Sequence, residues 1–333
     1  MQNNEGTDTK DLFYFIIPLI HISKVFGIAP FKLDSKTKIR KLIFSSKALT
    51  YSVIIFSLIF IGRIIDIYLV TKETYQIVYN KYKIVYMVIH FTTSFIIIVV
   101  YLIKYKTVLK LINFLAYFDI SVDNDIYEDG KILKTYYRTI IMIAIFIELF
   151  VIITLVIVID VNVQYNTVQF FAWITAFLIF FVTIVSDLQV VNLMLLFKQR
   201  FLVLNSAFYY NKFNALLVKK ETKSIVNKMS KNVVNDLSSK KLKHLINKYT
   251  KFSHICEIFS EAYSVQILFS IALKLIFILF NSYFNVVTML YEDVGGDYQP
   301  FWNVASMVLI ANATFHLVII IWSICAACSE VSR

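Results

Sequence analysis

The sequence predicts an all-α polytopic membrane protein with six transmembrane helices and a cytoplasmic amino terminus. The 333 residues are 59% hydrophobic, whereas soluble domains are about 45–50% apolar. The apolar residues are concentrated in runs of about 20 residues or more, the length of a membrane-spanning helix. Lysine and arginine residues are concentrated in the segments that lie on one side of these runs.

The apolar runs are predicted to be helices. Every backbone polar group must be hydrogen-bonded within the protein in lipid, so only helices or closed barrels span a membrane. The alternating segments of about ten residues that mark barrel strands are absent from the sequence. The expected spans are 48–71, 84–103, 139–159, 167–191, 263–291 and 301–325.

The positive charges predict the orientation. Segments 1–47, 104–138 and 192–262, together with the tail after residue 325, carry 28 of the 33 lysines and arginines. The segments on the opposite side carry three, all within 72–83. Since positive residues are retained on the cytoplasmic side, both termini of the chain are predicted to be cytoplasmic.

This topology divides the chain into five parts. A basic cytoplasmic loop separates the first four helices from the last two, and its end has apolar residues at helical spacing from Leu242 to Phe259. The polar stretch 219–241 in this loop is expected to be a linker, and Leu12–Ile20 is interpreted as an interfacial segment. The parts are a cytoplasmic amino-terminal segment (1–47), helices 1–4 (48–197), the basic loop with its amphipathic helix (198–262), helices 5 and 6 (263–325), and a cytoplasmic tail (326–333).

Polar side chains inside the spans are the candidates for function, because charges in a bilayer usually face the bundle interior. Arg63 and Asp66 are three residues apart and can pair on one helix face. Glu148 must face the interior, be protonated, or meet a partner such as His90 or Arg63. The ligand-binding candidates, most of them in the outer halves of the spans, are Arg63, Asp66, Tyr86, His90, Glu148, Gln169, Trp173, Asn281, Tyr283, Trp302 and Asn303.

Alternative interpretations of these residues remain open. Arg63 and Asp66 can be a self-neutralised pair near the outer interface. The tyrosines and tryptophans can belong to an aromatic belt at the lipid headgroups. The prediction of a small-molecule pocket therefore concerns the set of residues and not each member of it.

Several functional classes are disfavoured. The sequence has no phosphate-binding glycine loop and no hydrolase or metalloprotease motif, so we expect no enzyme, no catalytic residue and no cofactor. Cys325 and Cys328 have C-x-x-C spacing but no second ligand pair, so no metal site is expected. The net charge of +11 is attributed to the cytoplasmic loops and not to a nucleic-acid partner.

Among membrane proteins, a rhodopsin-like receptor is disfavoured because its amino terminus lies outside the cell. A transporter would favour internal repeats and helices interrupted by glycine or proline. The spans contain only Gly62 and no proline. A multi-pass transporter or scaffold without receptor function is kept as the alternative.

Two stretches resemble the insect gustatory receptor family. Residues 13–31 (FYFIIPLIHISKVFGIAPF) are similar to its amino-terminal leader, an apolar stretch followed by a Gly-x-x-Pro-Phe turn. Residues 258–268 (IFSEAYSVQIL) are similar to the entry into its fifth span. The order of loop lengths also matches, and the resemblance covers the whole chain.

The resemblance implies a receptor for tastants or other small molecules in the plasma membrane of sensory neurons. It implies a ligand-gated cation channel built as a homo- or hetero-tetramer with related subunits, in contact with lipid. The family has a seventh, pore-lining span that ends in Thr-Tyr-(apolar)-Gln-Phe, and this sequence lacks it. The expectation from this departure is a chain that does not conduct by itself.

Overall fold

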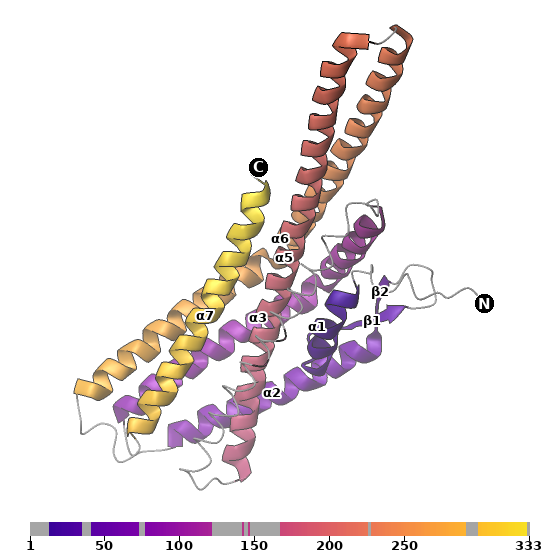
Figure 1. Ribbon diagram of the computed structural model, residues 1–333. Coiled ribbons are helices and arrows are strands. Elements are labelled where there is room, and N and C mark those ends of the chain that lie inside the picture. The colour runs from indigo at the N-terminus through magenta and orange to yellow at the C-terminus, as the bar shows by residue number, and fades with distance from the viewer. Residues whose placement is uncertain are drawn as a thin grey trace.

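The computed structural model describes residues 13–34, 41–72, 77–121, 142, 146, 167–225, 228–290 and 299–331. The elements are α1 (Phe13–Val25), β1 (Phe31–Asp34), β2 (Lys41–Phe44), α2 (Ser46–Lys72), α3 (Ile77–Ser121), α5 (Thr167–Ile225), α6 (Lys228–Leu290) and α7 (Gln299–Val331). They form an elongated helix bundle, from which one end of the α5–α6 pair projects (Figure 1). The prediction of a predominantly helical protein is confirmed.

The predicted Gly-x-x-Pro-Phe turn ends α1. Gly27 has φ 73°, a left-handed conformation that favours glycine because it has no Cβ. Two backbone amides after the helix, those of Ile28 and Ala29, donate to the Ser23 carbonyl at 2.7 and 3.3 Å. These bonds satisfy the end of α1 and direct the chain into β1.

The structure adds a two-stranded sheet that the all-α prediction did not include. β1 pairs antiparallel with β2, with Phe31 opposite Phe44. The Asn113 side chain on α3 both donates to and accepts from the backbone of Leu42, at 2.9 Å each. Strands of four residues are too short to give a periodic signal in the sequence.

Four described helices contain segments long and apolar enough to cross a membrane, and they overlap the first, fourth, fifth and sixth predicted spans. The predicted span 84–103 lies within α3. The predicted span 139–159 lies outside the described residues, except for Met142 and Phe146. The number of six spans and the cytoplasmic amino terminus therefore stay predictions. The four segments are Ser46–Leu69, Leu178–Tyr209, Leu242–Val287 and Ser306–Val331.

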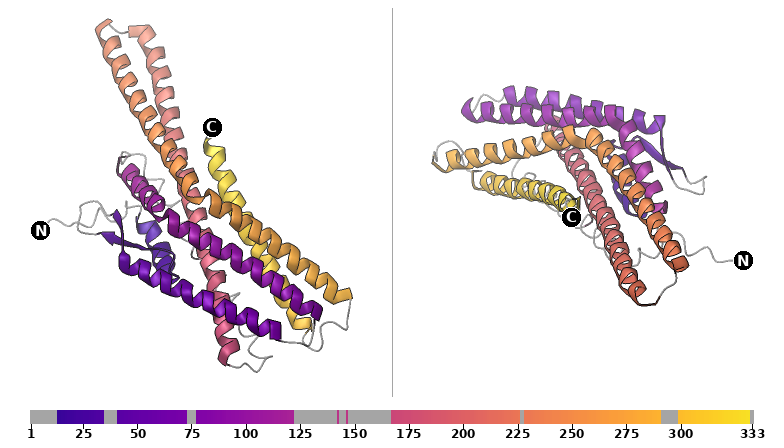
Figure 2. Two further views of the ribbon diagram at one scale, coloured as in Figure 1. Left: turned by 180° about the vertical axis from the view of Figure 1, so that it is seen from behind. Right: turned by 90° about the horizontal axis from the view of Figure 1, so that it is seen from above.

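α5 is the central helix of the bundle. It contacts α1, α2, α3, α6 and α7, and it crosses between them in both views of Figure 2. Its most apolar window is 78% buried, compared with 22% for those of α2 and α7 and 28% for that of α6. Most residues in the most apolar windows of α2, α6 and α7 are therefore not buried inside the bundle, as expected of segments that contact lipid.

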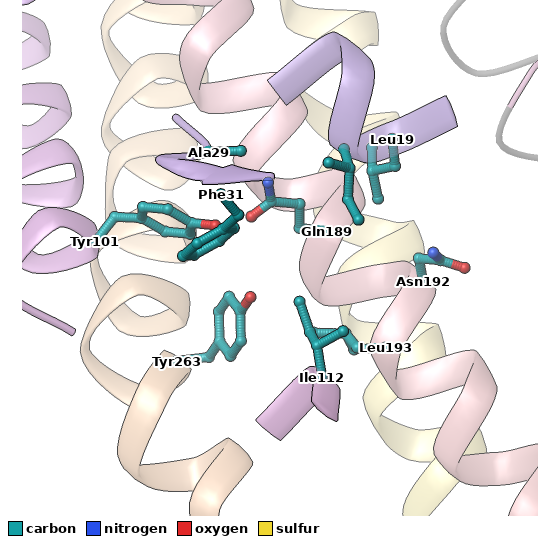
Figure 3. A pocket seen from close by; sticks show the side chains of 10 residues that line it. Leu19, Ala29, Phe31, Tyr101, Ile112, Gln189, Asn192, Leu193 and Tyr263 are labelled. Atoms are coloured by element: carbon teal, nitrogen blue, oxygen red, sulfur yellow. The ribbon is translucent and has the colours of Figure 1, made fainter. Parts of the chain in front are cut away.

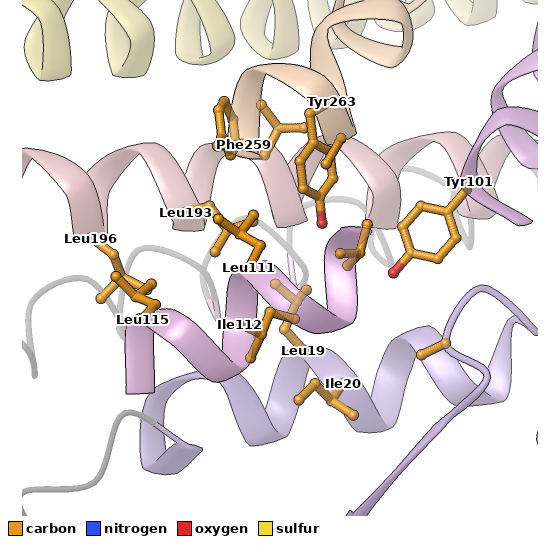
Figure 4. Close-up of a cluster of buried hydrophobic side chains, with 14 of the residues drawn as sticks. Leu19, Ile20, Tyr101, Leu111, Ile112, Leu115, Leu193, Leu196, Phe259 and Tyr263 are labelled. Carbon is orange, nitrogen blue, oxygen red and sulfur yellow. The ribbon is translucent and has the colours of Figure 1, made fainter. Parts of the chain in front are cut away.

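The main core lies where α1, α3, α5 and α6 meet (Figure 4). Phe252 of α6 is fully buried and its ring packs against Phe118, Phe197 and Phe201, with centroids 4.7–5.7 Å apart. The predicted apolar stripe of α6 is thus buried on the side that faces α3 and α5. Leu242 and Ile246, which belong to the same stripe, are exposed.

The segment expected to be a linker is helical in its described part. α5 continues to Ile225 and α6 begins at Lys228, so residues 219–225 and 228–241 belong to helices. Together the two helices form a long antiparallel hairpin that extends beyond the other helices (Figure 1).

The structure describes the side chains at the end of Leu12–Ile20, the segment interpreted as interfacial. Leu19 and Ile20 are buried in the main core. This part of the segment therefore packs on the protein itself.

Candidate functional site

The central helix α5 places polar side chains inside the bundle. Ser186, Asp187, Gln189 and Asn192 are all buried and all lie in the segment of α5 that is apolar enough to cross a membrane. Polar groups at such positions are costly unless they are paired within the protein, and they mark functional sites by default.

Three side chains of α6 pair with this part of α5. Lys274 donates to Asp187 and, at 2.7 Å, to the Ser270 hydroxyl, which in turn donates to Asp187. One turn further along, the Gln266 amide donates to the Ser186 carbonyl at 3.2 Å and also to its hydroxyl. We call these five residues the α5–α6 polar cluster.

The spacing on α6 explains why one helix face supplies the whole cluster. Gln266, Ser270 and Lys274 are four residues apart, which places them one above the other on a helix. The ion pair within the cluster is shielded from solvent, with side-chain exposures of 11% for Lys274 and 4% for Asp187. Both charges are therefore compensated by each other and by Ser270.

The chemistry available to the cluster is recognition between helices. Charge-assisted hydrogen bonds in a medium of low dielectric constant are strong and directional. A slide of α6 by one helical turn, about 5.4 Å, would bring a different residue opposite Asp187. The cluster thus favours one register of α5 against α6 and penalises the neighbouring ones.

Among the predicted site residues, three have described side chains. Arg63 on α2 is buried. The Asn281 amide on α6 donates to the Phe277 carbonyl at 2.8 Å and accepts from the Ser306 hydroxyl of α7 at 3.3 Å. Tyr283 is exposed on α6. The Asn281 side chain therefore connects α6 to α7.

The other predicted residues are placed by backbone alone. Asp66 lies on α2, Tyr86 and His90 on α3, Gln169 and Trp173 on α5, and Trp302 and Asn303 on α7; Glu148 lies outside the described residues. The predicted outer pocket therefore stays a prediction.

A small cavity lies further along the bundle, between the amino-terminal segment and the helices (Figure 3). Its volume is about 20 Å³, whereas pockets for small organic ligands measure about 300–1,000 Å³. The cavity is thus too small for a tastant in this conformation. It is lined by Leu19, Ile20, Ala29, Phe31, Tyr101, Ile112, Gln189, Asn192, Leu193 and Tyr263.

The sequence contained a signal for the polar cluster that the prediction did not use. Lys274 is the charged residue within the predicted span 263–291. Asp187 is the acidic residue within the predicted span 167–191. A lone positive and a lone negative charge in two spans are candidates for pairing.

The part of the chain that the structure describes contains no candidate metal site. No group of three histidine, cysteine, aspartate or glutamate side chains is positioned there to hold an ion. Cys325 and Cys328 are free and exposed.

Comparison with known proteins identifies a family. The family model described as 7tm Chemosensory receptor matches residues 16–333, which is nearly the whole chain. No curated protein matches the chain. The match includes most of the leader, from residue 16 on, the central helix and all five residues of the α5–α6 polar cluster.

Proposed function

The chain belongs to the 7tm chemosensory receptor family, and from this premise we propose that it is a gustatory receptor of the insect type. In this proposal it is a subunit of a ligand-gated cation channel in the plasma membrane of sensory neurons. Tastants or other small molecules bind within the outer half of the helix bundle. The membership itself establishes a chemoreceptor family and not an enzyme family.

The observation that carries the proposal is the α5–α6 polar cluster. A receptor needs helices that stay in one arrangement without ligand and reach a second arrangement with it. Asp187 and Lys274 supply a bond between the central helix and α6 that is specific for register. A protein that used α5 and α6 as a passive scaffold could replace this ion pair by apolar side chains without loss.

The ligand site is proposed at the outer residues named from the sequence. Arg63 and Asn281 contribute buried or partly buried polar groups on α2 and α6. Trp173 and His90 lie on α5 and α3, the helices that neighbour them in the bundle. A pocket of this kind combines apolar walls with a few polar groups.

Assembly into a homo- or hetero-tetramer with related subunits is part of the same proposal. The support is the α5–α6 hairpin, whose projecting end extends beyond the other helices (Figure 1). An isolated helical hairpin buries little apolar surface of its own, so contacts with further subunits would stabilise it.

The experiment is a calcium-imaging and current recording from cells that express the full chain, alone and together with related receptor subunits. A panel of sugars, bitter compounds and amino acids is applied, and surface expression is measured in parallel. The expected result is a tastant-evoked cation current in at least one combination. Surface-expressed protein that gives no current, but accumulates a radiolabelled solute in vesicles, would favour the transporter alternative instead.

The site is tested by His90→Ala and Trp173→Ala in the responding combination. Loss of a ligand contact worth about 1.4 kcal/mol moves the half-maximal concentration about tenfold. Leu279→Ala is the matched control, because Leu279 is an exposed apolar residue of α6. Unchanged half-maximal concentrations for both site variants would contradict the proposed pocket while leaving the channel function intact.

A further inference from the structure

The side-chain amide of Gln189 on the central helix donates a hydrogen bond through its nitrogen, but its oxygen has no hydrogen-bond donor among the described residues. Its Nε2 donates to the Ser23 hydroxyl of α1 at 2.7 Å. Its Oε1 is buried and accepts no hydrogen bond from any described residue. The side chain is 8% exposed, so bulk water does not supply the missing donor.

Two tyrosine hydroxyls are directed at the same space. Tyr101 of α3 and Tyr263 of α6 are both almost fully buried. In Figure 3 both hydroxyls point toward the cavity that Gln189 lines, from two different sides. The Tyr101 hydroxyl is close enough to Gln189 to interact with it, but Oε1 still lacks a donor in hydrogen-bonding geometry.

The size of the cavity matches one solvent molecule. Its volume is about 20 Å³, and a buried water needs about 10–15 Å³ together with two to four polar partners. The wall of the cavity is mostly apolar, but the Gln189 amide and the hydroxyls of Tyr101 and Tyr263 are directed at it, and these are the two to four polar partners that a buried water needs. An unsatisfied buried acceptor would destabilise the fold.

We propose that the cavity holds one ordered water molecule that links α3, α5 and α6 beneath the amino-terminal segment. The water donates to Gln189 Oε1 and accepts from the hydroxyls of Tyr101 and Tyr263. That gives it three hydrogen bonds, the number typical of buried waters.

The amino-terminal segment closes this water site. Leu19 of α1, Ala29 and Phe31 form the wall opposite the helices. Ser23 holds the same segment to Gln189. The glutamine thus joins the leader directly through its nitrogen and the tyrosines through the water on its oxygen, which explains why a buried polar residue stands at this position of α5.

The test is X-ray footprinting of the full chain in detergent micelles. A short pulse generates hydroxyl radicals from water, and mass spectrometry locates the oxidised side chains. A buried aromatic residue is oxidised only when a water molecule lies beside it. After each rate is divided by the intrinsic reactivity of its side chain, the expected result is severalfold faster oxidation of Tyr101 and Tyr263 than of Phe252, an aromatic residue of α6 that is also fully buried.

Equal, slow oxidation of all three aromatic residues would overturn the proposal. Gln189→Met keeps the volume but removes the acceptor, so oxidation of Tyr263 should fall to the rate of Phe252. Tyr101→Phe, which only removes a hydroxyl, provides a second variant in which oxidation of Tyr263 should fall. Oxidation of Tyr263 that stays fast in both folded variants would show that the water is not held by these groups, and would also refute the site.

Discussion

Replacing Lys274 by methionine tests the buried ion pair of the polar cluster. The variant removes the ammonium group and nearly keeps the volume, so it leaves the Asp187 carboxylate with Ser270 as its hydrogen-bond donor. The Asp187 side chain is only 4% exposed, so water cannot replace the lost cation. Breaking a buried ion pair from one side destabilises a protein by about 3–5 kcal/mol.

The magnitude can be measured as a shift of the thermal unfolding midpoint. For a chain of this size, 1 kcal/mol corresponds to about 2 °C, so Lys274→Met should lower the midpoint by about 6–10 °C. Purified full chain in detergent, followed by a fluorescent thiol dye or by size-exclusion chromatography after heating, gives the midpoint. Lys243→Met is the matched control, because Lys243 is an exposed lysine of the same helix, and its shift should be near zero.

The double variant Asp187→Leu/Lys274→Met separates pairing from simple burial. It removes both charges together, so no uncompensated charge remains, and most of the lost stability should return. The reasoning is refuted if Lys274→Met behaves like the control. It is also refuted if the double variant loses as much as the sum of the two single variants.

Two further predictions concern helix packing and use the same thermal assay. A Cβ added at Gly62 of α2 would lie 2.3 Å from Thr175 Cγ2 of α5. Gly62→Ala should therefore lower the unfolding midpoint, although alanine is about 1 kcal/mol more favourable than glycine in a helix. A higher midpoint would contradict the close approach of α2 to α5. The exchange Gly62→Ala/Thr175→Gly should restore part of the loss. Phe252→Ala removes a fully buried ring from the α3–α5–α6 core and should lower the free energy of unfolding by about 3–5 kcal/mol. Phe315→Ala, at an exposed position of α7, is its control. Equal midpoints for the two variants would contradict the assigned core.

The sequence by itself was sufficient for the features that depend on local composition. Long apolar runs give helices because a backbone in lipid must satisfy its own hydrogen bonds. The turn at Gly27 was expected from the resemblance of residues 13–31 to the family's leader, and Gly27 adopts there the left-handed conformation that glycine tolerates without strain. The period of the α6 stripe predicted an amphipathic helix, and Leu245, Phe252 and Phe259 of that stripe are buried.

The tertiary structure decided which side of each helix meets protein and which meets lipid. Hydropathy measures transfer out of water, and it is similar for a leucine that faces lipid and one that faces another helix. For this reason the sequence did not single out α5 as the central helix, and it predicted the exposed Leu242 and the buried Leu245 as one stripe.

The tertiary structure also decided which polar residues meet. Asp187 and Lys274 are 87 residues apart in the sequence. No local pattern and no helical period predicts a contact over that separation. Gln189, Tyr101 and Tyr263 come from three helices and converge on one cavity beneath the leader. Side-chain pairs of this kind depend on how the helices cross and on their rotation about their own axes, and these are fixed by the packing of the whole bundle.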